Sequence, residues 1–335
     1  MLKVCNILKN KVKSYEKPTQ EIFKLVEQFD KIAVYAHRSP DFDAFGSMFA
    51  VASFLKTYYP EKKVIALGES NPNLNGSLYP EMEMLPEEWD NNFLAIVVDT
   101  GNTARISDKS YVKSAKLIKI DHHPNVEPYG DVVFVDDTTV AVSEILTVLF
   151  LATKRKITQE TATYLYTGIV GDSGRFRYRA TTSLTFQVAA LLLEAGVDLD
   201  SVYNKIYALS HNELRLRAYI LNNHFITKEG FAYYVLSDAK LQELGTTVEV
   251  AKEQVNIFSD FKNVPVWASI IENKDRNEWR VSMRSRKISL SKFAAKWHGG
   301  GHAQASGASI LPGETLEQFV ADVDKLLKKH QGSKK

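Results

Sequence analysis

The chain has 335 residues, of which 44% are hydrophobic and 24% charged, and its net charge is only +2. This composition is that of a soluble globular protein, and the length exceeds what one ordinary core needs, so we expect two domains. A single cysteine, Cys5, excludes an internal disulfide framework and is typical of a reducing compartment. The N-terminus lacks the apolar stretch of a signal peptide, and no apolar run could span a bilayer. We therefore expect a cytoplasmic protein with no membrane segment.

In the first two-thirds of the chain, strand-like apolar runs alternate with helix-like patterns, which is typical of a mostly parallel sheet. The strands are expected at residues 32–36, 63–67, 93–98, 116–120 and 132–135. The helices are expected at residues 21–29, 44–58, 142–152, 158–170 and 183–194. Residues 71–88, which include three prolines, are expected to form a long loop. The pattern predicts a first α/β domain over residues 1–196.

A change of pattern after Gly196 indicates a second, smaller domain. Two helical patterns, 199–209 and 212–225, are interpreted as a helical linker over residues 197–225. Residues 226–335 then predict a second α/β domain, which we expect to face the first across a cleft. Its strands are expected at residues 232–236, 266–272, 278–285 and 308–311, and its helices at 248–258, 290–296 and 315–329.

Basic side chains are densest between Lys274 and Lys296. This stretch holds eight lysines and arginines against Asp275 and Glu278. A dense positive stretch is where an anionic substrate would be held, although a solvated charged face is the plainer explanation for most of these side chains individually.

Four short acidic or histidine-bearing motifs each follow an apolar segment. If one edge of the sheet gathers these segments, the motifs meet in one crevice. Oxygen and nitrogen donors in this number are what a pair of Mn²⁺-like ions requires, which predicts a two-metal phosphoesterase. The carboxylate and imidazole side chains that the four motifs offer are those of His37, Asp41, Asp43, Asp99, Asp121, His122, His123 and Asp172.

Each motif also has a plainer explanation. Asp41 or Asp43 could simply cap a helix that begins near residue 44, because Pro40 prevents an earlier start. A cap accounts for one carboxylate but not for two carboxylates and a preceding histidine. The adjacent His122 and His123 would point in opposite directions in an extended segment, so both can serve one site only at a turn. The four motifs together are a much stronger signal than any one of them.

A glycine-rich segment, Gly299-Gly300-Gly301-His302, follows the basic stretch. Three consecutive glycines let backbone N–H groups approach an anion closely and permit positive φ angles without penalty. The alternative is a structural turn between the helix at 290–296 and the next strand. We favour an anion-binding role because the basic stretch immediately precedes these glycines.

Taken together, these motifs resemble the DHH family of phosphoesterases. The set His-x-x-Pro-Asp-x-Asp, Asp99, Asp-His-His and Asp172 is similar to the family's metal-binding motifs, and the glycine segment resembles the loop of the DHH-associated domain. The resemblance covers about residues 20–330. The segments 120–131 and 167–176 resemble the NrnA type within the family. That type implies a hydrolase of ester bonds that degrades short oligoribonucleotides (nanoRNA) and dephosphorylates 3′-phosphoadenosine 5′-phosphate (pAp).

The resemblance also implies a role for each residue of the motifs. His37 and Asp41 would hold one Mn²⁺, Asp43, His122 and Asp172 the other, and Asp99 would bridge them. Co²⁺ or Mg²⁺ could replace Mn²⁺. His123 would lie beside the scissile phosphate, and Asp121 would orient the histidines. The residues expected to bind the substrate are Arg105, Arg284, Gly299, Gly300, Gly301 and His302.

The partners we expect are short single-stranded RNA, pAp or dinucleotides, and a homodimer is compatible with the sequence.

Three other functions remain as alternatives. A related enzyme could instead cleave cyclic di-AMP or its linear product pApA. The manganese pyrophosphatase branch is disfavoured by the glycine loop and Arg284. A non-catalytic nucleotide-binding sensor is disfavoured because binding alone would not require all six metal ligands. Two departures from the family, Phe42 and His298, would affect the fit of the substrate and not the chemistry.

Overall fold

The computed structural model describes residues 4–71, 74, 78–301 and 303–332, which form two compact units, Met1–Tyr207 and Ala208–Lys335. The first unit contains a five-stranded, entirely parallel sheet in the order β2-β1-β3-β4-β5. Its strands are β1 (Lys31–Tyr35), β2 (Lys63–Leu67), β3 (Leu94–Val98), β4 (Lys116–Asp121) and β5 (Val132–Val135). The predicted α/β class is confirmed, and these five strands lie within one residue of their expected positions at each end.

The two faces of this sheet have different covers. One face packs against helices α1 (Val4–Gln28), α2 (Phe42–Tyr58) and α3 (Val142–Ala152), with strand residues such as Val34 and Ile96 in the shared core. Alternate residues on the same strands face the other side, where Trp89, Phe93 and Ile106 cover them. Trp89 ends the short 3₁₀ helix Glu87–Trp89, Phe93 precedes the first residue of β3, and Ile106 follows the short 3₁₀ helix Thr103–Arg105. Strands β1 and β3 are therefore buried on both faces, which explains their nearly continuous apolar sequences.

Helix α1 is much longer than the segment predicted at residues 21–29. It begins at Val4 and continues through Pro18, a residue that normally ends or kinks a helix. Tyr15 and Ile22, on either side of Pro18, are both buried in the core. Packing of these side chains therefore outweighs the hydrogen bond that Pro18 removes from the helix.

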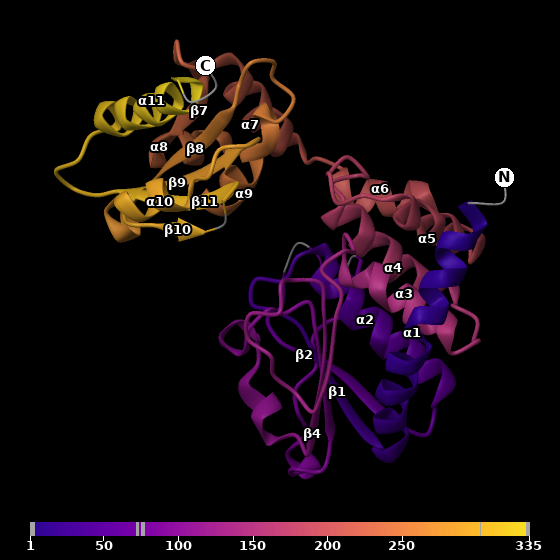
Figure 1. Cartoon of the computed structure of the whole chain (residues 1–335). Helices are drawn as coiled ribbons and strands as arrows, with labels where there is room; N and C mark the ends of the chain where they lie inside the picture. Colours follow the sequence, from indigo (N-terminus) through magenta and orange to yellow (C-terminus); the bar gives the residue numbers. More distant parts are fainter. Residues whose placement is uncertain (1–3, 72–73, 75–77, 302, 333–335) are drawn as a thin grey trace. The chain divides into compact units, whose positions relative to one another are not determined.

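Three further helices complete the first unit: α4 (Gln159–Asp172), α5 (Ser183–Glu194) and α6 (Leu199–Tyr207). In Figure 1, α3, α4 and α5 lie side by side. Helix α6 places Val202 in the core of this unit. The next helix, α7 (His211–Asn222), places Leu216 and Ile220 in the core of the second unit. The two helices of the predicted linker thus pack into different units, and the units divide between Tyr207 and Ala208.

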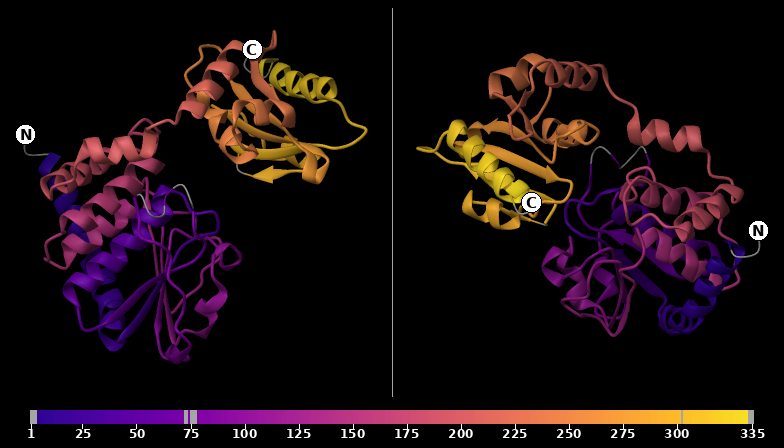
Figure 2. Two further views of the ribbon diagram at one scale, coloured as in Figure 1. Left: turned by 180° about the vertical axis from the view of Figure 1, so that it is seen from behind. Right: turned by 45° about the horizontal axis from the view of Figure 1, so that its top comes forward.

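The second unit is built on a mixed six-stranded sheet in the order β10-β11-β9-β8-β7-β6, in which only β7 and β8 are parallel. The strands are β6 (Phe225–Ile226), β7 (Phe231–Leu236), β8 (Val266–Asn273), β9 (Glu278–Ser285), β10 (Gly300–Gly301) and β11 (Ala305–Ile310). Helices α10 (Ser291–Lys296) and α11 (Leu316–Gly332) cover one face, and both views in Figure 2 show α11 against this unit. Helices α7, α8 (Asp238–Leu244) and α9 (Val248–Glu253) cover the other.

Some local predictions for the second unit were wrong. The helix expected at residues 248–258 is α-helical only to Glu253 and continues as the 3₁₀ helix Gln254–Phe258. Helix α8 and the two-residue strands β6 and β10 were not predicted, because each is too short to show a clear period. Within the described residues, no helix combines the length and the apolar character needed to cross a membrane.

The buried Glu144 of α3 provides a test of packing in the first unit. Its side chain is 1% exposed, and burial raises its pKa to about 6. The Glu144 carboxyl ionises at a lower pH in the unfolded chain than in the folded chain. The free energy of unfolding therefore falls as the pH rises from about 4.5 through 6. A shift of this size corresponds to about 2 kcal/mol. We expect Glu144→Gln to stabilise the protein at pH 7.5 relative to wild type by about that amount more than at pH 4.5.

Urea denaturation of both proteins at the two pH values measures this difference. If the unfolding free energy had the same pH dependence in the variant and the wild type, ionisation of the buried Glu144 would not reduce the stability of the protein.

Candidate metal centre

The predicted metal ligands of the first unit gather at the carboxyl-terminal edge of its parallel sheet. His37 follows β1, Asp99 follows β3 directly, and Asp121 is the last residue of β4, immediately before His122. Asp41 and Asp43 lie at the start of α2, and Asp172 is the last residue of α4. This edge is where open parallel sheets place their ligands, because the loops that follow neighbouring strands diverge there.

One group of donors consists of His37, Asp41 and Asp99, whose ligand atoms all lie within 4.8 Å of one another. His37 Nε2 is 3.4 Å from Asp99 Oδ2 and 3.7 Å from Asp41 Oδ2. The other oxygen of Asp41 accepts hydrogen bonds from the backbone N–H groups of Asp43 and Ala44, which caps α2. Asp41 therefore caps the helix with one oxygen and presents the second to the donor group.

A second group consists of Asp43, His122 and Asp172, again with ligand atoms within 4.8 Å of one another. His122 Nε2 is 3.4 Å from Asp172 Oδ2. Asp43 is fully buried, and its two oxygens accept hydrogen bonds from the first N–H groups of α3, those of Val142 and Ser143. The positive end of α3 thus stabilises the Asp43 carboxylate and fixes its orientation.

Asp99 lies between the two groups. Its Oδ2 faces His37, while its Oδ1 is 3.5 Å from His122 Nε2. The residue is 2% exposed, and its backbone has a φ of +48°, which is uncommon for any residue except glycine. Among the described residues, the buried Oδ1 atom has no hydrogen-bond partner. A buried carboxylate oxygen in this condition requires a compensating positive charge, and a divalent cation would supply it.

The charges of the cluster are strongly unbalanced in the protein alone. Burial and the neighbouring Asp99 raise the pKa of Asp43 to about 7. Burial and the charges of Asp43 and Asp41 raise the pKa of Asp172 well above its usual value. Burial disfavours the charged form of Asp99, but the neighbouring imidazoles of His122 and His37 outweigh that effect and lower its pKa. Carboxylate and imidazole donors in this mixture suit Mn²⁺, Co²⁺ or Zn²⁺ better than Ca²⁺, which prefers oxygen alone.

The Asp121-His122-His123 segment turns sharply at the end of β4, so both histidine rings lie on the same side. Their ring centroids are 4.7 Å apart, and His123 Nδ1 is 3.6 Å from Asp99 Oδ1. Asp121 is fully buried and its Oδ1 is 2.9 Å from His123 Nδ1. The His123 side chain is 38% exposed, compared with 15% for His122. His123 is therefore the histidine that a substrate can reach.

Lys119 supports this segment and was not predicted from the sequence. The residue is completely buried, and its Nζ lies 3.5 Å from Asp121 Oδ2. The ammonium group also donates to the carbonyl oxygens of Gly101 and Glu127 and to the Asn125 side chain. It thereby ties the loop after β3 to the loop after β4. The signal in the sequence was a lone lysine within the apolar run Leu117-Ile118-Lys119-Ile120.

The predicted substrate-binding residues are divided between the two units. Arg105 lies beside the first donor group, with its Nη2 3.5 Å from His37 Nδ1. Arg284 lies on β9 of the second unit, where it lines a hollow of about 550 Å³ beside the glycine segment. Lys252, Arg276 and Arg280 line the same hollow, against the single carboxylate Glu278. The predicted His302 lies outside the described residues.

The three glycines of this segment have different structural requirements. A Cβ atom at Gly299 would lie 2.0 Å from the carbonyl oxygen of Gly307, so only glycine fits there. Gly301 has a φ of +136°, and its Cβ would lie 2.7 Å from the Ala305 carbonyl oxygen. Gly300 has open space at the Cβ position. Packing against β11 therefore explains two of the glycines, and Gly300 is the one whose lack of a side chain leaves the hollow open.

Residues 31–169 match the DHH family, N-terminal domain, and residues 228–329 match the DHHA1 domain. The Bacillus subtilis bifunctional oligoribonuclease and PAP phosphatase NrnA is 34% identical over 93% of this chain and 99% of its own length. A Streptococcus mutans protein named probable bifunctional oligoribonuclease and PAP phosphatase NrnA is also 34% identical, over 92% and 98%. An exopolyphosphatase-related protein from Bacteroides fragilis has a similar structure, with a TM-score of 0.83 and 26% identity over 94% and 97%.

The close packing of α4 against Asp43 yields a prediction. A Cβ at Gly168 would lie 2.1 Å from Ser143 Oγ and 2.7 Å from Asp43 Oδ1, so Gly168→Ala must displace the carboxylate. We expect a loss of stability of about 1–3 kcal/mol from overpacking, together with weakened divalent-metal binding. Urea denaturation and metal titration calorimetry measure the two effects.

Gly307→Ala is the control, since the nearest atom to its Cβ would be 3.8 Å away. Unchanged metal affinity in Gly168→Ala, with stability reduced, would show that the position of Asp43 is not critical for metal binding.

Proposed function

We propose, because the chain belongs to the DHH family of phosphoesterases, that it degrades short oligoribonucleotides and removes the 3′-phosphate of pAp to give AMP. Family membership makes the chain a hydrolase that acts on phosphoester bonds. The choice of substrates is supported by two relatives named as oligoribonuclease and PAP phosphatase, of which this chain covers 99% and 98%.

The observation that carries the proposal is the position of Asp99. Its two carboxylate oxygens face opposite ways, one toward His37 and the other toward His122, so one side chain joins two separate groups of donors. A single metal would not need two groups, and a helix cap would not need a buried carboxylate that lacks a hydrogen-bond donor on one oxygen.

We assign one Mn²⁺ to His37 and Asp41 and a second to Asp43, His122 and Asp172, with Asp99 as a ligand shared by both. When bound, such a pair of ions lowers the pKa of a coordinated water and stabilises the attacking and leaving oxygens of an in-line displacement. The protein's part is to hold six donors rigidly. The α3 N-terminus performs this task for Asp43, and the α2 cap performs it for Asp41.

His123 is the residue that we place beside the scissile phosphate. Asp121 Oδ1 is within hydrogen-bond distance of His123 Nδ1, which makes that nitrogen the donor and leaves Nε2 for the phosphoryl or leaving-group oxygen. Lys119 in turn neutralises the buried Asp121 and anchors the surrounding loops. This chain of contacts fixes the orientation of the imidazole before the substrate arrives, which is what general acid–base catalysis requires.

The second unit would hold the distant end of the substrate. The hollow lined by Lys252, Arg280 and Arg284 is rich in positive charge, and the exposed glycine segment lines it as well. Cationic side chains suit the phosphates of a short nucleotide chain, and a segment without side chains lets such a ligand approach closely.

Purified protein with Mn²⁺, offered pAp, 5′-labelled di- and pentanucleotides, pApA, cyclic di-AMP and pyrophosphate in parallel, tests the proposal. We expect turnover of pAp and of the short RNAs. Preference for cyclic di-AMP or pApA by more than tenfold in kcat/KM would move the enzyme to the cyclic-dinucleotide alternative. No turnover of any substrate by metal-loaded protein would favour a nucleotide-binding sensor.

A further prediction concerns Asp99. We expect Asp99→Asn to reduce turnover more than tenfold and to lower the bound Mn²⁺, because the amide carries no charge and offers only one oxygen. Asparagine tolerates the left-handed backbone at this position, so the variant should fold. Steady-state kinetics and elemental analysis give the two measurements.

Asp137→Asn, which changes an exposed carboxylate outside both donor groups, is the matched control. Residual activity above a tenth of wild type in Asp99→Asn, with two metals retained, would rule out a bridging role.

Another prediction distinguishes substrate binding by the second unit from the chemical step. We expect Arg284→Ala to raise KM for pAp and dinucleotides by about tenfold or more, the loss of one charge-assisted phosphate contact, with little change in kcat. Hydrolysis of a small chromogenic phosphodiester, which lacks the distant end, should change much less.

Lys292→Ala is the control, since this exposed lysine lies in the same basic stretch but does not line the hollow. If Arg284→Ala reduced activity on the chromogenic ester as much as on pAp, Arg284 would affect folding or the chemical step and not substrate binding.

A further inference from the structure

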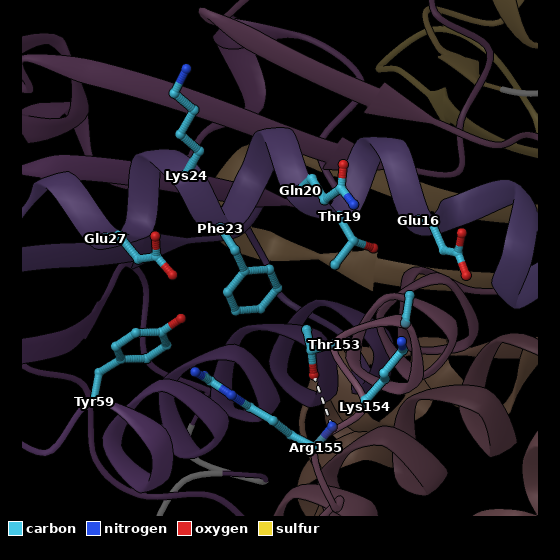
Figure 3. Close-up of a pocket in the computed structure, with 11 residues that line it drawn as sticks. Glu16, Thr19, Gln20, Phe23, Lys24, Glu27, Tyr59, Thr153, Lys154 and Arg155 are labelled. Carbon is cyan, nitrogen blue, oxygen red and sulfur yellow. Dashed lines mark hydrogen bonds between the residues drawn. The ribbon is translucent and has the colours of Figure 1, made fainter.

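The first unit contains a second pocket, away from the metal centre. It lies between α1 and the turns that follow α2 and α3, and it has a volume of about 510 Å³ (Figure 3). None of its lining residues belongs to either donor group. The volume falls within the range of small-molecule sites in proteins, about 300–1,000 Å³. The residues that matter for its chemistry are Thr19, Phe23, Glu27, Tyr59, Lys154 and Arg155.

Two buried polar atoms on opposite walls of this pocket have no hydrogen-bond partner within the described part of the chain. One is Thr19 Oγ1, on a residue that is 4% exposed, and the other is Arg155 Nη1. Buried hydroxyl and guanidinium groups nearly always have partners, so each unpaired atom requires an explanation. A ligand with acceptor oxygens, bound between α1 and Arg155, would satisfy both.

Arg155 is held in place without any carboxylate. Its guanidinium carbon lies 4.5 Å from the ring centroid of Tyr59 and 5.0 Å from that of Tyr58. No Asp or Glu among the described residues forms an ion pair with it. Its backbone N–H donates to Thr153 Oγ1, the dashed line in Figure 3, so the turn after α3 is also fixed. The aromatic contacts orient the guanidinium and leave its charge available to an anion.

The other lining residues indicate which chemical groups the ligand carries besides its anionic group. Phe23 extends from α1 into the space between this helix and Arg155 (Figure 3), and a flat ring of this kind can stack on a base. Lys154 adds a second positive charge next to Arg155. Lys24, Glu16 and Glu27 also line the pocket, so three basic side chains face two acidic ones and the lining has a small positive excess, which suits a ligand with a single phosphate.

We propose that this pocket binds a nucleoside monophosphate, with the phosphate on Arg155 Nη1 and the Thr19 hydroxyl and the base against Phe23. The carboxylates of Glu16 and Glu27 would accept hydrogen bonds from the sugar or the base. The assignment rests on these contacts and does not depend on which substrate the metal centre hydrolyses.

Photo-crosslinking with 8-azido-AMP, followed by peptide mapping, tests the location of binding in the full chain. We expect crosslinks within residues 16–27 or 152–155 that excess AMP abolishes. Crosslinks confined to the metal centre or to the hollow beside Gly300, or no crosslink at all, would overturn the proposal.

Titration calorimetry with AMP, adenosine, inorganic phosphate and ATP tests the chemistry of recognition. We expect AMP to bind most tightly, with Arg155→Ala weakening AMP by about tenfold or more and Thr19→Val by about threefold to tenfold. Thr19→Val keeps the shape of the side chain, so it guards against a folding defect in Arg155→Ala. Lys156→Ala, an exposed neighbour outside the lining, is the control and should bind AMP normally.

Hydrolytic activity separates this proposal from the previous one. We expect Arg155→Ala and Thr19→Val to hydrolyse a chromogenic phosphodiester within twofold of wild type, because neither residue contacts a metal-centre donor. The pocket would not recognise a phosphate if adenosine bound as tightly as AMP. The same would follow if both Thr19→Val and Arg155→Ala bound AMP as tightly as the wild type.

Discussion

The first unit is arranged around the mutual repulsion of four carboxylates that occupy one small volume. Asp41 and Asp99 belong to one donor group and Asp43 and Asp172 to another; within each group the ligand atoms lie within 4.8 Å of one another, and Asp43 and Asp99 are almost completely buried. Charges at this separation in a poorly solvated site oppose folding unless something compensates them. The surrounding backbone supplies part of the compensation, through the N–H groups at the starts of α2 and α3. The two histidines supply a further part, and the unpaired Asp99 Oδ1 shows that a part is still missing.

Close helix packing makes this arrangement possible. A Cβ at Gly46 of α2 would lie 2.6 Å from the Tyr164 carbonyl oxygen of α4, and one at Gly171 would lie 2.6 Å from Phe42 Cβ. Together with Gly168, these positions let α2 and α4 approach until Asp43 and Asp172, on different helices, face the same histidine. The glycines in α2 and α4 therefore serve the geometry of the site at the expense of helix propensity, which is a common compromise at functional positions.

The sequence predicted the sheet of the first unit well because its strands are continuous apolar runs that end in polar motifs. The same motifs identified the residues that the structure brings together, since carboxyl ends of parallel strands share one edge. Contacts between distant segments were beyond such reasoning. Nothing local indicates that Thr19 and Arg155 line the same pocket, or that Lys119 is the partner of Asp121. The extent of α1 was missed because Pro18 is a local signal that packing of Tyr15 and Ile22 overrides.

The glycine segment shows how a structural and a functional explanation of one motif can be separated residue by residue. Steric contacts with β11 require glycine at positions 299 and 301, so these two would be glycine even in a protein that binds nothing. Position 300 has no such requirement, and a side chain there would project into open space. Glycine costs stability in a strand through its conformational freedom, so its presence in β10 without a steric reason calls for a different cause. Close approach of a ligand to the backbone, as in the function that we propose, would be such a cause, and the basic side chains around the hollow would suit an anion.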